Sequence, residues 1–227
     1  MSLIVHGFPH SPFCLAIESA LRAFQVPFES KFVPPWDRSE ILRLTHGHGY
    51  EVPVLEHDDR VIYESSGDSQ DVAHYIDGEF GDERLFPNRL QGRHELLIRY
   101  LEHEVEDVTF RLFDPHYVDT IDDVANRGML IRHKERKFGR GCIERWRQEH
   151  GSLAETAAHL LCPLDSMLHT DPFLFGTEPV FADFLLSGIL GNITFSGFNP
   201  LPARMQRLAA FQKRMAEFQY AAAAVVA

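Results

Sequence analysis

The residues best suited to chemistry form one short segment near the start of the chain, Ser11-Pro12-Phe13-Cys14. It follows an apolar run, 3–7, that is typical of a strand, and it opens a segment with helical apolar spacing. Proline is favoured in the first turn of a helix, where its missing N–H is not needed. The free N–H groups and the positive dipole end of such a helix stabilise an anion, above all a thiolate. The segment therefore predicts chemistry on a thiol beside Ser11.

Length and charge limit the classes of protein that fit. The chain has 227 residues and a net charge of −11, which favours one large domain or two small ones and argues against nucleic acid and anionic membranes as partners. It contains no run of 18 apolar residues and no basic segment before an apolar core, so we expect neither a membrane span nor a secretory signal.

Cysteine and histidine usage adds a further limit. Cys14, Cys142 and Cys162 show no paired spacing, and the 13 histidines are scattered along the chain. We therefore expect reduced thiols, a cytoplasmic protein and no metal site.

The first part of the chain alternates between strand and helix signals. Strands are predicted at 3–7, 28–33, 52–55 and 60–63, and helices at 12–25, 38–45 and about 68–76. The order βαβαββα predicts a compact α/β domain with a mixed sheet over residues 1–78.

The remainder has almost only helical signals. Helices are predicted at 89–113, 152–169, 179–195 and 202–220, whereas 119–148 is polar and ambiguous. A polar linker at 77–88 contains Gly78, Gly81 and Pro87, so a second, all-α helical-bundle domain is predicted over residues 88–227.

Four motifs, in this order, carry a resemblance to a known family: Ser11-Pro12-Phe13-Cys14, then Val52-Pro53-Val54-Leu55, then Asp68-Ser69 before Val72 and Tyr75-Ile76, and finally Leu174-Phe175-Gly176 with Ala182-Asp183-Phe184. The set resembles the glutathione transferase superfamily, and it extends over nearly the whole chain. The resemblance implies a thioredoxin-like N-terminal domain followed by an all-helical domain, with glutathione as co-substrate.

Two positions depart from the family pattern. Val180 stands where the family has a Ser or Thr N-cap, so we expect Thr177 or a shifted helix start to satisfy the free amides. We expect Asp183 to be structural, bonding free amides early in a buried helix. Asp68-Ser69 lies four residues beyond the usual position of the acidic-Ser pair, which Glu64-Ser65 occupies.

The resemblance gives the first motif two candidate catalytic residues. Ser11 would donate a hydrogen bond to the thiolate of glutathione, and as a favoured cap it could equally serve only the helix. Cys14 would be a small buried apolar residue or, alternatively, form a mixed disulfide with glutathione.

The other implied contacts lie along bound glutathione. A cis peptide bond before Pro53 would turn the backbone of Val52 toward the cysteinyl part. Asp68 and Ser69, with Ser65 as the alternative, would bind the γ-glutamyl end. The glycyl carboxylate would meet a residue of the segment after the second strand: Trp36, Arg38, His46 or His48.

Together these features predict a glutathione transferase that joins the thiolate to a small hydrophobic electrophile. The electrophile pocket is expected between the domains, walled by Phe8, Pro9, Phe110, Phe113 and Tyr117. Alternatives are a glutathione-dependent reductase or lyase acting through Cys14, and a binding or assembly module without catalysis. The resemblance also implies a homodimer.

Overall fold

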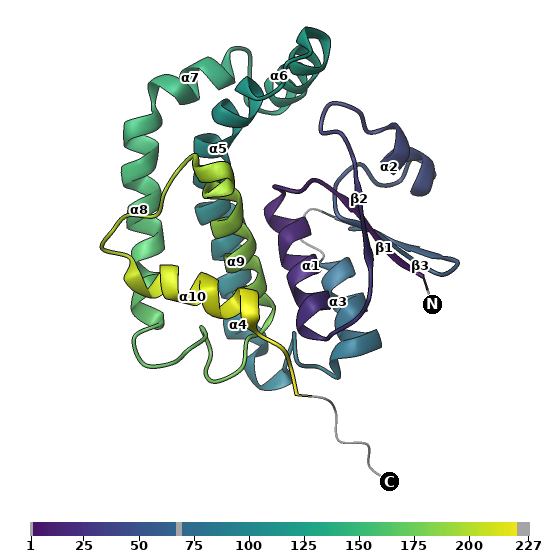
Figure 1. Cartoon of the computed structure of the whole chain (residues 1–227), viewed down its shortest axis with the longest axis vertical. Helices are drawn as coiled ribbons and strands as arrows, with labels where there is room; N and C mark the ends of the chain where they lie inside the picture. Colours follow the sequence, from purple (N-terminus) through teal and green to yellow (C-terminus); the bar gives the residue numbers. More distant parts are fainter. Residues whose placement is uncertain (1, 67–69, 222–227) are drawn as a thin grey trace.

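A mixed four-stranded sheet forms one side of the molecule (Figure 1). The computed structural model describes residues 2–66 and 70–221. The strands β1 (Leu3–Gly7), β2 (Glu29–Phe32), β3 (Val54–His57) and β4 (Arg60–Ile62) have the spatial order β2-β1-β3-β4. β1 runs parallel to β2 and antiparallel to β3, which is antiparallel to β4. The predicted mixed sheet is therefore confirmed.

Three helices accompany the sheet in the predicted order βαβαββα. They are α1 (Pro12–Ala23), α2 (Ser39–Leu44) and α3 (Asp71–Ile76), and α3 continues as the π-helical segment η1 (Asp77–Gly81). The last helix thus begins at Asp71 rather than near Asp68, and Asp68 and Ser69 lie outside the described residues. All four residues of β2, which lies at one edge of the sheet, are exposed.

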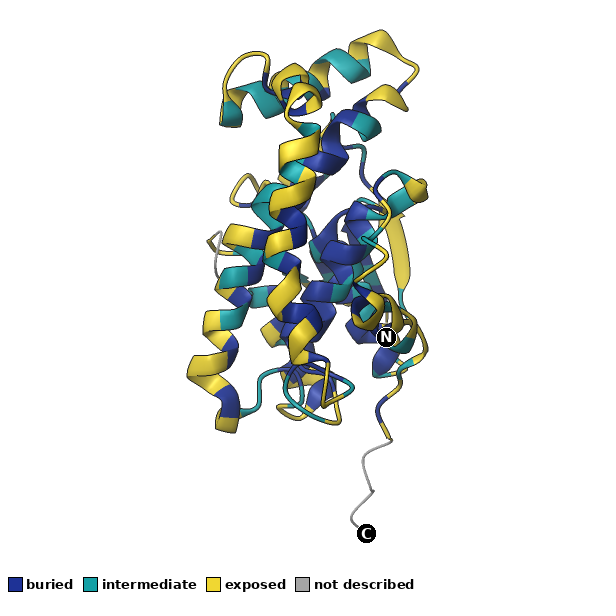
Figure 2. Cartoon of the chain, turned by 90° about the vertical axis from the view of Figure 1, so that its left-hand side faces the viewer, coloured by how far each residue is buried: buried dark blue, intermediate teal, exposed yellow. Residues whose placement is uncertain are grey.

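The second half is helical, as predicted. Its elements are η2 (Asn88–Leu90), α4 (Gln91–Tyr100), η3 (Leu101–Glu106), α5 (Asp107–Asp119), α6 (Val124–Phe138), α7 (Cys142–Gln148), α8 (His150–Met167), α9 (Phe181–Ile193), η4 (Phe195–Gly197) and α10 (Gln206–Glu217). The ambiguous region 119–148 contains α6 and α7, which Figure 2 shows as largely exposed or intermediate. Across residues 2–66 and 70–221, none of the helices has the length and apolar character needed to cross a membrane.

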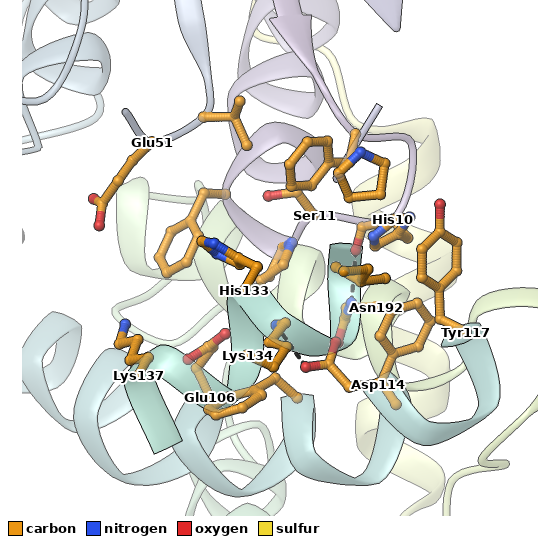
Figure 3. A pocket seen from close by; sticks show the side chains of 18 of the residues that line it. His10, Ser11, Glu51, Glu106, Asp114, Tyr117, His133, Lys134, Lys137 and Asn192 are labelled. Carbon is orange, nitrogen blue, oxygen red and sulfur yellow. Dashed lines mark hydrogen bonds and ion pairs between the residues drawn. The ribbon is translucent and has the colours of Figure 1, made fainter. Parts of the chain in front are cut away.

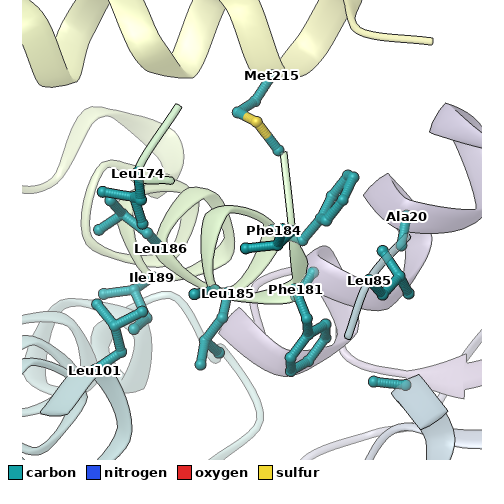
Figure 4. Packing of buried hydrophobic residues seen from close by; sticks show 14 of the residues in the cluster. Ala20, Leu85, Leu101, Leu174, Phe181, Phe184, Leu185, Leu186, Ile189 and Met215 are labelled. Atoms are coloured by element: carbon teal, nitrogen blue, oxygen red, sulfur yellow. The ribbon is translucent and has the colours of Figure 1, made fainter. Parts of the chain in front are cut away.

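One hydrophobic core joins the two halves of the chain. It contains buried side chains of β1, α1, α3, α4, α9 and α10, and Figure 4 shows Phe184, Leu185 and Ile189 of α9 within it. α9 is apolar on nearly all sides, as expected for a helix that is buried all round.

α9 packs tightly against α1, and this contact connects the two halves. A Cβ atom at Gly188 of α9 would lie 2.1 Å from the carbonyl oxygen of Pro12 and 3.1 Å from the backbone nitrogen of Ala16. Glycine is therefore required at this position, because any side chain would meet the backbone of α1. The contact connects α9 directly to the start of the helix that carries Ser11.

Candidate functional site

Ser11 lies at the first turn of α1, where the sequence motif predicts it. Its Oγ accepts a hydrogen bond from the backbone N–H of Cys14 at 3.4 Å, so Ser11 is the N-cap of the helix. A hydroxyl group that accepts one hydrogen bond can still donate its own proton to another atom. Ser11 also lines a cavity of about 560 Å³, so capping and ligand contact are compatible (Figure 3).

Cys14 is buried one turn into the same helix. Its side chain is 1% exposed, and burial raises the pKa of the thiol to about 11, although a hydrogen bond with Ser11 opposes this effect. A thiol in such surroundings is poorly nucleophilic. These features favour the prediction of a buried apolar residue over that of a mixed disulfide.

The loop before β3 brings a second motif to the cavity. The Val52–Pro53 peptide bond is cis, as predicted, and Val52 lines the cavity together with Ser11. Val52 and Pro53 also line a smaller cavity of about 60 Å³, which contains Glu64 and Gln70. The two motifs therefore lie side by side although 40 residues separate them.

The start of α3 differs from a free helix N-terminus. The carboxylate of Glu64 accepts hydrogen bonds from the backbone N–H groups of Asp71 at 2.7 Å and Val72 at 3.3 Å. Ser65 is exposed, and its N–H donates to Oδ2 of Asp71 at 2.7 Å. Since Asp68 and Ser69 lie outside the described residues, of the predicted γ-glutamyl site only Ser65 has a described position.

The candidates for the glycyl carboxylate occupy different surroundings. His48 is exposed and lines a separate cavity of about 160 Å³, and His46 is exposed. Trp36 packs against the hydrophobic cluster around Trp146. Only Arg38 of these four lines the same cavity as Ser11.

Arg38 is held by aromatic rings. Its guanidinium carbon lies 4.4 Å from the centre of the Phe8 ring and 5.3 Å from that of Tyr50. Nε and Nη1 are buried and have no hydrogen-bond partner among the described residues. Burial lowers the pKa of Arg38 from its usual value, whereas Tyr50 and Glu51 raise it, and two N–H groups without a partner are well suited to a carboxylate ligand.

The apolar wall of the cavity is largely the predicted one. Phe8, Phe110, Phe113 and Tyr117 line it, whereas Pro9 is not among the lining residues. His10 adds to this wall with its ring centre 4.0 Å from that of Tyr117, and burial lowers the pKa of its imidazole to about 3. His10 is therefore neutral in the folded protein.

Sequence reasoning missed the polar wall that α5, η3 and α6 supply. Its residues include Glu106, Asp114, His133, Lys134 and Lys137. The Nζ atom of Lys134 lies 2.5 Å from Oδ2 of Asp114 (Figure 3). The i, i+3 spacing of the two lysines was the available signal, but such spacing is also typical of a solvated helix face.

Two further contacts connect this wall with the N-terminal half. Tyr50 forms a hydrogen bond of 3.0 Å from its hydroxyl to Nδ1 of His133. Asn192 at the end of α9 donates from Nδ2 to the carbonyl oxygen of His10 at 2.7 Å. The backbone beside Ser11 is therefore fixed by a side chain from the C-terminal half.

The start of α9 shows how the missing Ser or Thr cap is replaced. The prediction that Thr177 or a shifted helix start satisfies the amides is wrong. The N–H of Ala182 donates to Nε2 of His94 at 3.0 Å, and the N–H of Phe181 donates to the carbonyl oxygen of Leu85 at 3.0 Å. A histidine from α4 therefore performs the capping role that Val180 cannot.

Asp183 has the structural role predicted for it. Its Oδ1 accepts from the N–H of Leu174 at 2.8 Å and its Oδ2 from the N–H of Val180 at 3.0 Å. The side chain is fully buried, and burial raises the pKa of the carboxyl to about 7 against the opposing effect of these two donors.

Because Nε2 of His94 accepts a hydrogen bond, the folded protein requires the neutral imidazole. Burial lowers the pKa of His94 to about 4, below its usual 6.5, so its contribution to stability is complete above pH 6.5 and lost as the pH falls toward 4. We expect this single group to cost about 2 kcal/mol of unfolding free energy between pH 7 and pH 5.

His94→Gln is the matched variant for this prediction, because its amide oxygen can accept from Ala182 without titrating. Urea unfolding at both pH values should show that the variant loses about 2 kcal/mol less than the parent protein. An identical loss in both proteins would contradict the prediction.

Residues 10–78 match the family model described as the glutathione S-transferase N-terminal domain. No curated protein sequence matches the chain.

Several solved structures share the fold over nearly the whole chain. Glutathione transferase GSTFuA3 from Phanerochaete chrysosporium has a TM-score of 0.79 at 16% identity, covering 97% of this chain and 98% of its own. CsGST63524 of Ceriporiopsis subvermispora, a glutathione S-transferase in complex with glutathione, has a TM-score of 0.79 at 13% identity. The match covers 99% of this chain and 100% of that one. Glutaredoxin 2 from Salmonella typhimurium, in complex with glutathione, has a TM-score of 0.74 at 23% identity. The match covers 95% of this chain and 93% of that one.

These findings give the fold class: an α/β thioredoxin-like unit is followed by a helical one, as in the glutathione transferases. The predicted resemblance to the glutathione transferase superfamily is thereby confirmed, with residues 10–78 matching its N-terminal domain.

Proposed function

We propose that this protein is a glutathione transferase that joins the thiolate of glutathione to a small, largely apolar electrophile. The observation that carries the proposal is the position of Ser11, at the start of α1 and on the wall of a cavity whose other residues include Phe8, Phe110 and Phe113. A hydroxyl group that can donate a hydrogen bond to a thiolate and aromatic side chains that can contact an apolar electrophile thus line the same cavity. The similar structures that hold glutathione support this choice of thiol.

In this proposal, glutathione lies along Val52 with its cysteinyl part and directs its glycyl carboxylate to Arg38. The unpartnered Nε and Nη1 of Arg38 favour this residue over the exposed His48. The γ-glutamyl end is assigned to Ser65, or to Asp68 and Ser69, in the segment before α3. The engagement of the α3 amides by Glu64 favours hydroxyl and carboxylate contacts there over direct contact with those amides.

Catalysis would consist of thiolate stabilisation and proximity. Lowering the thiol pKa by about two units requires about 3 kcal/mol of preference for the anion. A hydrogen bond from the Ser11 hydroxyl to a charged acceptor contributes about 1.5–3 kcal/mol, and the helix N-terminus adds to this. The cavity would add to the reaction rate by holding the electrophile beside the sulfur.

The predicted consequence of Ser11→Ala is a rate defect at nearly unchanged affinity. We expect glutathione to bind within about threefold of the parent Kd, while kcat falls about 10- to 100-fold, since one charge-assisted hydrogen bond is lost. Calorimetry gives the Kd, and conjugation of 1-chloro-2,4-dinitrobenzene gives kcat. Ser39→Ala, an exposed serine outside the cavity, is the control, and full activity of Ser11→Ala would remove Ser11 from the mechanism.

A second candidate function is glutathione-dependent reduction through Cys14, which the similarity to glutaredoxin 2 favours and the burial of Cys14 opposes. Mass spectrometry after treatment with oxidised glutathione separates the two, because only the reductase proposal requires an adduct on Cys14.

A third candidate, a binding module without catalysis, is favoured by the engaged amides of α3. It would bring no thermal stabilisation by millimolar glutathione, whereas the transferase proposal requires stabilisation.

We also propose a homodimer, a cytoplasmic location, and two domains bounded by residues 78 and 88, from the resemblance and the sequence pattern. Light scattering of the purified protein tests the dimer.

A further inference from the structure

Tyr50 and His133 join the two halves of the chain at the cavity that Ser11 lines. Tyr50 belongs to the loop before β3, and His133 belongs to α6. A hydrogen bond of 3.0 Å connects the Tyr50 hydroxyl with Nδ1 of His133, and the two ring centres lie 5.5 Å apart. Both residues line the cavity, and Figure 3 shows His133 on its wall. The contact thus brings a side chain of the helical half to the N-terminal part of the cavity.

Tyr50 in turn contacts Arg38. The guanidinium carbon of Arg38 lies 5.3 Å from the centre of the Tyr50 ring and 4.4 Å from that of Phe8. These contacts leave Nε and Nη1 of Arg38 buried and without a hydrogen-bond partner among residues 2–66 and 70–221. The two rings therefore hold the guanidinium in one orientation and leave two of its nitrogen atoms for a ligand.

The carboxylates that line the cavity do not occupy Arg38. Asp114 is paired with Lys134 at 2.5 Å, and Glu51, which follows Tyr50, is exposed. In the part of the chain that the structure describes, no ion pair joins the guanidinium of Arg38 to a carboxylate. Its positive charge is therefore available to an anionic ligand.

The direction of the hydrogen bond between Tyr50 and His133 follows from what each group can donate. Burial has the largest effect on His133 and lowers the pKa of its imidazole to about 4, and the charge of Arg38 lowers it further. The imidazole is therefore neutral near pH 7, and its Nδ1 can accept the proton of the Tyr50 hydroxyl. Since a guanidinium only donates, this arrangement leaves the lone pairs of the Tyr50 oxygen for Arg38.

We propose that His133 is a positioning residue for glutathione: through Tyr50 it holds the guanidinium of Arg38 in the orientation that binds the glycyl carboxylate. This inference rests on the proposed function, which assigns that carboxylate to Arg38. α6 itself packs against α5 and α7, so the hydrogen bond with Tyr50 also connects α6 to the N-terminal half. The affinity of the N-terminal half for its own ligand thus depends on a side chain of the helical half.

Two ligands that differ at the glycyl end test the proposal. Glutathione amide carries a neutral carboxamide in place of the glycyl carboxylate and is otherwise identical to glutathione. We expect His133→Phe and Tyr50→Phe each to raise the Kd of glutathione about 3- to 10-fold and to leave the Kd of glutathione amide within about twofold, as calorimetry measures. With 1-chloro-2,4-dinitrobenzene as electrophile, the KM for glutathione should rise by the same factor while kcat stays within about twofold.

Three further variants separate positioning from a structural role. His133→Asn keeps an amide that can bond the Tyr50 hydroxyl and should bind glutathione within about twofold of the parent protein. The double variant with phenylalanine at both positions should bind no more weakly than Tyr50→Phe alone, since His133 acts through that hydroxyl. His159→Phe is the matched control, because His159 belongs to α8, is exposed and does not line the cavity.

Equal losses for both ligands, no loss for glutathione, or additive losses in the double variant would overturn the role of His133. Equal affinity of the parent protein for the two ligands would also overturn it, because the glycyl carboxylate would then not be recognised. Conjugation of the chloroarene by the parent protein would still support a transferase in each case, whereas a parent protein that binds neither ligand and conjugates nothing contradicts the proposed function itself. Thermal unfolding identifies a folding defect in His133→Phe, and Tyr50→Phe, which removes one oxygen from a residue that is 40% exposed, then provides the test.

Discussion

Gly188→Ala is expected to lower the free energy of unfolding by about 2–4 kcal/mol, one of the two largest effects in this protein. The new methyl group would lie 2.1 Å from the carbonyl oxygen of Pro12, and backbone atoms cannot move aside as the end of a side chain can. α9 must therefore shift away from α1, which opens the core that joins the two halves. Urea unfolding followed by circular dichroism measures the change.

Gly128→Ala is the control for this prediction. Gly128 is also helical, but a Cβ atom there meets nothing within 4 Å, so the same substitution should raise stability by about 0.5–1 kcal/mol through helix propensity. Equal stability of Gly188→Ala and the parent protein would show that the approach of α9 to α1 is not tight.

Asp183→Ala is expected to have a comparable or larger effect, roughly 3 kcal/mol or more. The N–H groups of Leu174 and Val180 would be left buried without acceptors, and each such donor costs about 1–3 kcal/mol. Loss of the segment before α9 should also expose Phe173 and Leu174, which are buried in the main core.

The measurement is again the free energy of unfolding, with Asp171→Ala as an exposed control from the same loop. Asp183→Asn keeps one acceptor oxygen and should lose less than Asp183→Ala. A loss under 1 kcal/mol in Asp183→Ala would contradict the capping role.

The elements of the N-terminal half were predictable because their signals are local. Pro12 after Ser11 identifies the start of α1, and short apolar runs ended by turn residues identify the strands. The place of β2 at the edge of the sheet was not predictable, since it depends on the pairing of strands distant in sequence.

Site residues were predictable only where their role depends on the backbone of their own segment. Ser11 and the cis bond before Pro53 belong to this class. Glu106 and Lys134 do not, because a charged residue on a polar helix looks the same whether it faces water or a cavity. Their position on the cavity wall depends on how η3 and α6 are packed beside residues of the N-terminal half.

The cap of α9 shows the same limit most clearly. Val180 correctly indicated that the usual cap is missing, but the replacement, His94, stands 88 positions from Ala182. No periodicity or local spacing connects the two residues, so only the packing of α4 against α9 reveals the contact.

The bare backbone contact at Gly188 also bears on how such proteins can be recombined. A chimera that joins residues 1–81 of this chain to the helical half of a relative inherits the carbonyl oxygen of Pro12, which tolerates only hydrogen opposite it. Donors with glycine at the facing position should give folded hybrids in which Ser11 keeps its location, whereas donors with alanine or a larger residue there should not.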